Sequence, residues 1–138
     1  MNDKILNKLA DHYKTYRFAV SSNTAIAANA FVSWSNDYTT DTDVYLDSSN
    51  KKIKFRKAGL VRVHVHLAGL SGSDGRLWCV LRGGEFVAQG LSHGPYVSTD
   101  IIAVYNVTTS TELYVEIIDA FTLNSGGVGP CTFTVEYM

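Results

Sequence analysis

The stretch Leu60-Val61-Arg62-Val63-His64-Val65-His66-Leu67 decides the fold of this 138-residue chain. Apolar and polar side chains alternate along it with a period of two, the pattern of a β-strand with one face in a core and the other toward solvent. The alternation predicts that the valines and Leu67 face the core, and that Arg62, His64 and His66 face outward. The same alternation recurs in residues 112–119 and 132–137.

Short β-type runs continue from residue 31 to the last residue. The predicted runs are 31–34, 43–46, 52–57, 60–70, 76–82, 85–91, 97–107, 112–120 and 131–138. Gly83-Gly84 lies between two apolar runs and predicts a tight hairpin, because glycine accepts the positive φ angles of such a turn. Eight or nine short strands with no second helix predict a mainly β fold, an antiparallel β-sandwich or jelly roll.

The first 17 residues carry a helical pattern. Ile5, Leu9 and Tyr13 recur at steps of four, with Leu6 beside them, and polar residues fill the other face. This short amphipathic α-helix packs either on its own domain, or on copies of itself or a larger particle. We expect the helix at residues 1–17, a linker of small and polar residues at 18–30, and the head at 31–138.

The composition restricts the class of partner. A net charge of -1 and a pI near 6.4 give no basic surface for nucleic acid. The sequence has no run of about twenty apolar residues that would insert into a membrane. Its first residues lack the basic-then-apolar pattern of a cleaved signal peptide. Cys79 and Cys131 lack metal or redox spacing, so we expect buried free thiols.

Two of the predicted strands are apolar on both faces. Residues 77–81 (Leu-Trp-Cys-Val-Leu) and 101–105 (Ile-Ile-Ala-Val-Tyr) break the alternation. A sandwich buries only one face of each sheet, so these runs imply that something covers the second face. The simplest cover is another copy of the chain.

Three groups of polar residues are candidates for a catalytic or metal site. His64 and His66 project from one strand face, but no Cys or third His lies nearby to complete a metal site. The acidic group Asp37, Asp41, Asp43 and Asp47 does not have the spacing of a helix-loop-helix calcium site, and a solvated loop is the simpler interpretation. Ser92, His93 and Asp100 lack the strand-to-helix elbow of a hydrolase. We therefore expect no catalytic residue, no metal and no cofactor, and the chain is predicted not to be an enzyme.

Aromatic residues near turns are the remaining candidates for a ligand-binding surface. They are Tyr38, Tyr45, Tyr96 and Phe121. Aromatic rings beside Asp and Asn suit flat contacts with sugars or protein loops. The alternative is that such residues cap the ends of the sheets and belong to the core.

Five motifs, in this order, resemble the tumour necrosis factor-like jelly roll, the superfamily that includes complement globular heads. They are Phe31-Val32-Ser33-Trp34, Asn50-Lys51-Lys52-Ile53-Lys54-Phe55, Ala58-Gly59-Leu60-Val61-Arg62-Val63, Leu81-Arg82-Gly83-Gly84-Glu85-Phe86 and Cys131-Thr132-Phe133-Thr134-Val135-Glu136-Tyr137. The resemblance covers residues 31–138. It implies a homotrimer whose subunits meet through the outer faces of one sheet.

The resemblance also suggests where the trimer forms and what it does. Arg62, His64, His66 and Tyr114 are expected at the trimer interface, and Ile5, Leu6, Leu9 and Tyr13 are expected to attach or align the trimer. By analogy, a small chain with a trimer-type head is similar to a bacteriophage virion component such as a capsid decoration protein, head fibre or spike. Its partners would be itself and the major capsid or another virion protein, and its place the virion, assembled in the host cytoplasm.

Two alternatives remain open at this point. One is a receptor-binding adhesin, the head of a tail or surface fibre that recognises a host surface glycan or protein through its aromatic loops. The other is a secreted trimeric ligand, which the missing export signal disfavours. Removal of residues 1–17 would separate the first two, because a decoration protein would lose its particle whereas an isolated adhesin head would still bind cells.

Overall fold

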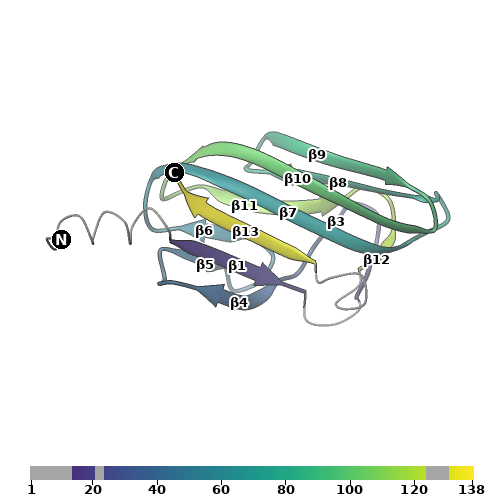
Figure 1. Ribbon diagram of the computed structural model, residues 1–138, viewed down its shortest axis with the longest axis horizontal. Coiled ribbons are helices and arrows are strands. Elements are labelled where there is room, and N and C mark those ends of the chain that lie inside the picture. Colours follow the sequence, from purple (N-terminus) through teal and green to yellow (C-terminus); the bar gives the residue numbers. More distant parts are fainter. Residues whose placement is uncertain (1–13, 21–23, 124–130) are drawn as a thin grey trace, which may run out of the picture.

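The computed structural model describes residues 14–20, 24–123 and 131–138, and the regular structure in these ranges is entirely β-strand (Figure 1). The strands are β1 (Thr15–Ala19), β2 (Thr24–Ile26), β3 (Ala30–Phe31), β4 (Ser35–Thr39), β5 (Val44–Leu46), β6 (Ile53–Phe55), β7 (Gly59–Ser71), β8 (Arg76–Arg82), β9 (Phe86–His93), β10 (Tyr96–Val107), β11 (Glu112–Ile117), β12 (Phe121–Leu123) and β13 (Thr132–Tyr137). No helix in these ranges is long and apolar enough to cross a membrane.

The strands form two antiparallel sheets that pack face to face. In the first sheet β7 pairs with β10 on one side and with β13 on the other, and β1 and β4 follow β13. The short strand β12 also pairs with β7, and β2 with β12. The second sheet has the order β5-β6-β11-β8-β9, with β3 beside β11. Figure 1 shows the first sheet in front, from β10 at the top to β4 at the bottom. The predicted mainly β antiparallel sandwich is confirmed.

The core lies between the sheets and follows the alternation read from the sequence. Val61, Val63, Val65 and Leu67 are all 0% exposed. Inward residues of β11 and β13 complete the centre: Leu113, Val115, Ile117, Phe133 and Val135. The ring of Trp34 meets that of Phe133 edge-on, with centroids 5.6 Å apart. The period of two therefore assigned the buried faces of these three strands correctly.

The prediction for the N-terminal region is wrong where the structure describes it. Thr15–Ala19 form β1, which pairs with β13 and β4, so the helix does not extend to Arg17. Tyr16 and Phe18 are fully buried, and β2 and Ala30 of β3 also lie within the predicted linker. The proposed attachment residues Ile5, Leu6, Leu9 and Tyr13 lie outside the described residues. Residues 15–20 alternate buried and less buried positions because they join the sheet, and a linker would not.

Most other predicted strands are present, with shifts at their ends. Of the first predicted run, 31–34, only Phe31 belongs to a strand, β3, and the following strand, β4, was not predicted. Because β4 lies at the sheet edge and is largely exposed, its polar sequence carries no core pattern. The Gly83-Gly84 hairpin between β8 and β9 is confirmed, with Gly84 at a φ of 86°.

The two cysteines are reduced thiols in the core, as predicted. Burial raises the pKa of Cys79 to about 12, although a hydrogen bond toward the carbonyl of Gly90 lowers it slightly. Because the thiolate is the reactive form, we expect dithionitrobenzoate at pH 8 to label the native protein at least about a hundred-fold more slowly than the urea-unfolded chain. Labelling at equal rates would contradict the described burial.

Candidate functional site

The outward surface of β7 and β10 is the main candidate for a functional surface. We call it the β7–β10 face and define it by the outward residues of the two strands: Tyr96, Ser98, Asp100, Ile102, Val104 and Asn106 on β10, and Leu60, Arg62, His64, His66 and Leu70 on β7. The register places Ile102 opposite His64, and Val104 opposite Arg62. Side chains on one face of an antiparallel pair lie side by side, so these residues form one continuous surface.

Large apolar side chains are exposed across this face. Ile102 is 67% exposed and Val104 54%, although both lie in the middle of a twelve-residue strand. Leu60 and Leu70 are about half exposed, and Tyr96 is 83% exposed. Isolated exposed apolar residues are ordinary, but several large ones on the same face of one strand pair are typical of an association surface. The prediction that residues 101–105 are apolar on both faces is confirmed.

The other strand predicted to need a partner is covered by its own chain. Val80 of β8 points outward but is only 3% exposed. It lies between Gln89 and Glu116 in the register, and Trp78 Nε1 donates a hydrogen bond of 3.1 Å to Gln89 Oε1. Side chains of the same sheet therefore exclude water from Val80, and residues 77–81 require no second copy.

Two histidines and one aspartate form the polar centre of the β7–β10 face. His64 Nε2 lies 2.7 Å and His66 Nδ1 3.0 Å from the same oxygen, Oδ1 of Asp100. Burial raises the pKa of Asp100, but the hydrogen bonds to His64 and His66 outweigh it and leave the pKa below its ordinary value. Beside this cluster, Arg62 pairs with Glu136 of β13 at 2.7 Å. The ionisable groups of the face are thus already paired within one chain, which lowers the cost of covering them.

The structure brings three of the four predicted interface residues together. Arg62, His64 and His66 lie on one face of β7. Tyr114 belongs to β11 of the second sheet and faces outward there, so it does not share a surface with the other three. Alternation shows whether a side chain points into the core, but it does not show which sheet carries the strand, and this led to the wrong grouping.

The aromatic residues predicted in loops have different fates. Tyr96 and Tyr38 are exposed, at the start of β10 and on β4. Tyr45 is half buried under the guanidinium of Arg56, whose Cζ lies 3.9 Å from the ring centroid. Phe121 is 2% exposed and belongs to the core, so its proposed role in ligand binding is wrong. The four residues do not form one binding site.

Side chains of the three polar groups that the sequence offers as catalytic or metal sites make contacts within the chain. Asp37 pairs with Arg17, and Asp41 accepts a hydrogen bond from Tyr16 and pairs with Lys14. Asp100 contacts the two β7 histidines, and no hydrogen bond to His93 is present among the described residues. In residues 14–20, 24–123 and 131–138, no three His, Cys, Asp or Glu side chains form a group that could hold a metal ion.

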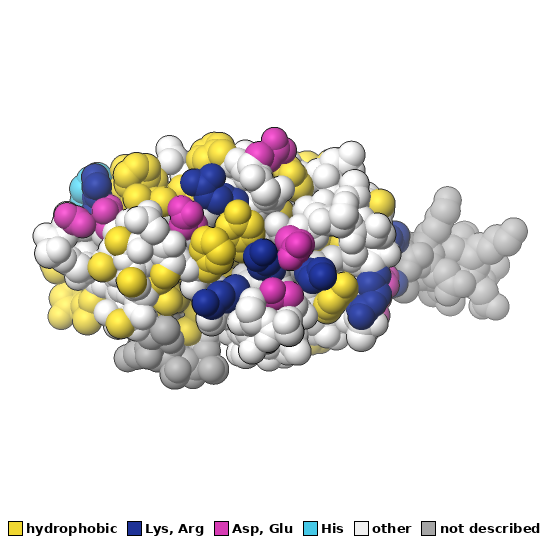
Figure 2. Space-filling view, turned by 180° about the vertical axis from the view of Figure 1, so that it is seen from behind, with side chains coloured by type: hydrophobic (Ala, Val, Ile, Leu, Met, Phe, Trp, Pro, Cys, Tyr) yellow, Lys and Arg dark blue, Asp and Glu magenta, His cyan; other side chains and the backbone are white. Residues whose placement is uncertain are grey.

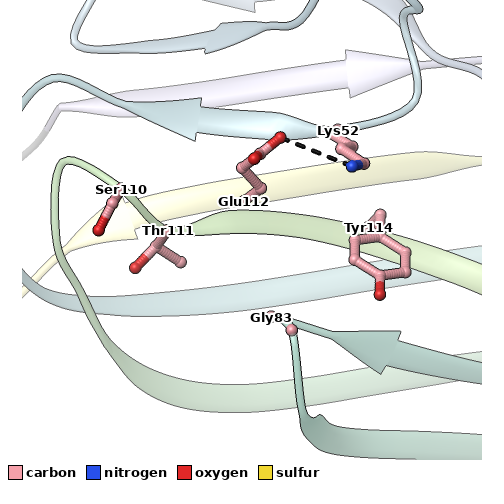
Figure 3. A pocket seen from close by; sticks show the side chains of 7 residues that line it. Lys52, Gly83, Ser110, Thr111, Glu112 and Tyr114 are labelled. Atoms are coloured by element: carbon pink, nitrogen blue, oxygen red, sulfur yellow. Dashed lines mark ion pairs between the residues drawn. The ribbon is translucent and has the colours of Figure 1, made fainter.

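An open groove of about 360 Å³ lies on the outward side of the second sheet. Its lining comes from the residue before β6, the β8–β9 hairpin, the β10–β11 turn and β11: Lys52, Gly83, Gly84, Ser110, Thr111, Glu112 and Tyr114. In Figure 3, Lys52 and Glu112 lie along one side, Gly83 on the opposite side, and Tyr114 and Thr111 at the two ends. Figure 2, which shows this side of the molecule, has apolar groups interleaved with charged ones. Sequence reasoning did not identify this groove.

Comparison with known proteins gives matches only at the level of structure. No protein-family model matches the sequence, and no curated protein sequence matches it. Eiger TNF from S. frugiperda superposes with a TM-score of 0.75 at 13% identity, over 90% of this chain and 91% of that one. Murine APRIL gives 0.72 at 12% identity, over 89% and 98%. The globular domain of zebrafish complement 1qA gives 0.67 at 9% identity, over 91% and 97%.

These structures share the complete sandwich with this chain but little of its sequence. The coverage of about nine-tenths on both sides means that the two sheets, and not a single motif, correspond. Identity of 9–13% carries no site residue across. The chain therefore has the TNF-like and complement-head jelly-roll fold.

Proposed function

We propose that the protein is the non-enzymatic head of a homotrimer that assembles through the central part of its β7–β10 face, around Ile102 and Val104, with Tyr96 at the start of β10 outside the contact. The observation that carries the proposal is the exposure of Ile102 and Val104 at the centre of a long strand, where a lone chain gains nothing from hydrating them. The resemblance to the TNF-like jelly roll supports three copies in particular. A closed ring of three buries the same set of surfaces in every subunit.

The ends of the sandwich support an attachment role for such a trimer. Strand β1 begins at Thr15, opposite Glu136 and beside the C-terminal end of β13 (Figure 1). The β7–β8 and β9–β10 turns lie together at the opposite end of the sandwich, where the Gly94 amide donates to the Gly75 carbonyl. With the threefold axis along the strands, the β1 strands of all three subunits begin at one end. We propose that this end binds a bacteriophage particle, through its major capsid or another virion protein.

Removal of residues 1–13 tests this attachment role. The deletion leaves β1 intact, whereas a deletion of 1–17 would remove the buried Tyr16. We expect the shortened chain to form an assembly with the same number of subunits as the full-length protein. We expect it to lose binding to particles that lack the protein, as measured by co-sedimentation. Retained binding by the shortened chain would contradict the proposed anchor.

A receptor-binding head is the second candidate function. Tyr96, the most exposed large apolar residue of the described chain, lies next to the β9–β10 turn and away from Thr15. An exposed aromatic ring at the free end of a trimer suits contact with a host glycan or protein. Under this alternative, isolated heads bind host cells, and Tyr96→Ala weakens that binding without changing the mass of the assembly.

A further inference from the structure

We infer that the groove on the second sheet binds a neutral saccharide. The groove is built by a single chain, from β11 of the second sheet and the turns beside it, and shares no residue with the β7–β10 face. It needs no second chain, so it is present in a monomer and in any assembly that leaves this side of the molecule exposed. The inference does not depend on the proposed assembly.

The groove presents hydrogen-bonding groups of both kinds with spare capacity. Lys52 Nζ lies 3.8 Å from Glu112 Oε2, which is too far for a direct hydrogen bond. A ligand hydroxyl between them can accept from the ammonium and donate to the carboxylate at normal distances. Among the described residues the Tyr114 hydroxyl has no hydrogen-bond partner, so it can both donate to a ligand and accept from it.

The walls of the groove are held in place before any ligand arrives. The ring of Tyr114 contacts the ring of Phe31, with centroids 4.6 Å apart. The β10–β11 turn is fixed by hydrogen bonds in which the Thr108 amide donates to Thr111 Oγ1 at 2.9 Å and Thr108 Oγ1 meets Ser110 Oγ at 3.0 Å. The Tyr114 ring and the β10–β11 turn therefore lose little freedom on binding, which favours affinity for a small ligand.

The lining selects among ligand classes. Its single cation, Lys52, faces the carboxylate of Glu112, so the groove gives little net attraction for a phosphate or sulfate. The many polar groups disfavour an apolar ligand. A sugar ring offers hydroxyls that both donate and accept, and an apolar C–H face for the Tyr114 ring. The groove volume of about 360 Å³ lies at the lower end of the range for small-molecule sites.

The test exposes the labelled full-length protein to a printed array of neutral and acidic oligosaccharides, and then titrates the strongest neutral probe in solution. Glu112→Ala removes the charged acceptor and is expected to weaken binding at least about ten-fold. Tyr114→Phe keeps the ring and removes only the hydroxyl, for an expected loss of about two- to ten-fold. Gln89→Ala, on the same sheet but outside the groove, is the matched control and should bind as the wild type does.

Three outcomes would overturn the inference. They are no binding to any neutral probe, binding confined to sulfated or sialylated probes, and neutral binding that both groove variants leave unchanged. The mass of the assembly, measured on the same samples, distinguishes a failure of this inference from a failure of the proposed trimer. A trimer without saccharide binding refutes only the groove, and a monomer that binds saccharide refutes only the trimer.

Discussion

Ile102→Asp is expected to convert the proposed trimer into a folded monomer. Ile102 is 67% exposed in the single chain and lies beside His64 at the centre of the β7–β10 face. Loss of about 2 kcal/mol of apolar burial per subunit, summed over three subunits, lowers the association constant about 10⁴-fold. An unpaired carboxylate in each buried copy of the face adds to this cost.

The control for this variant is Leu91→Asp. Leu91 is a comparably exposed aliphatic residue, at 50%, on β9 of the second sheet. We expect it to leave the trimer intact. Sedimentation velocity measures the assembly, and far-UV circular dichroism verifies that both variants are folded. Equal sedimentation of Ile102→Asp and wild type would exclude this residue from the interface.

Phe18→Ala is expected to destabilise the fold by about 3–5 kcal/mol. Phe18 is fully buried in β1, opposite Phe133, and its removal leaves a cavity between the sheets. This loss is a large part of the roughly 5–15 kcal/mol that stabilises a typical domain. Urea unfolding of the full-length protein, followed by tryptophan fluorescence, measures the change.

Phe86→Ala is the matched control for the core variant. Phe86 is 56% exposed at the start of β9, so its truncation should shift the free energy of unfolding by much less. If Phe18 belonged to a linker, as the sequence pattern predicted, the two variants would have similar stability. That result would contradict the placement of β1 in the first sheet.

The central strands could be predicted because the alternation that defines them lies within each strand. Val61, Val63 and Val65 alternate with Arg62 and His64, and burial of one face dictates that order wherever the strand pairs. The short and exposed strands lack this signal. β4 is largely exposed at a sheet edge, and β12 has only three residues.

The N-terminal strand was not predicted because a strand periodicity and a helical periodicity overlap in this part of the sequence. Tyr16, Phe18 and Val20 are spaced by two and buried, which is a strand pattern. Tyr16 also continues the helical spacing of Ile5, Leu9 and Tyr13. The alternation through residue 20 was the available signal for a strand that starts near residue 15.

The surface features depended on sheet register, which one sequence does not supply. Alternation predicted that His64 and His66 share a face, but their contact with Asp100 requires the pairing of β7 with β10. Tyr114 was correctly predicted to face outward and was assigned to the wrong surface, because its sheet depends on long-range topology. The groove joins three separate segments of the chain for the same reason.

The most direct test of the proposed assembly is sedimentation equilibrium of the full-length protein over a range of micromolar concentrations. The exposed β7–β10 face predicts a single species with three times the 15.2 kDa mass of the chain. A species that stays at 15.2 kDa at every concentration would mean that Ile102 and Val104 remain hydrated in the native protein, and it would contradict the proposed trimer.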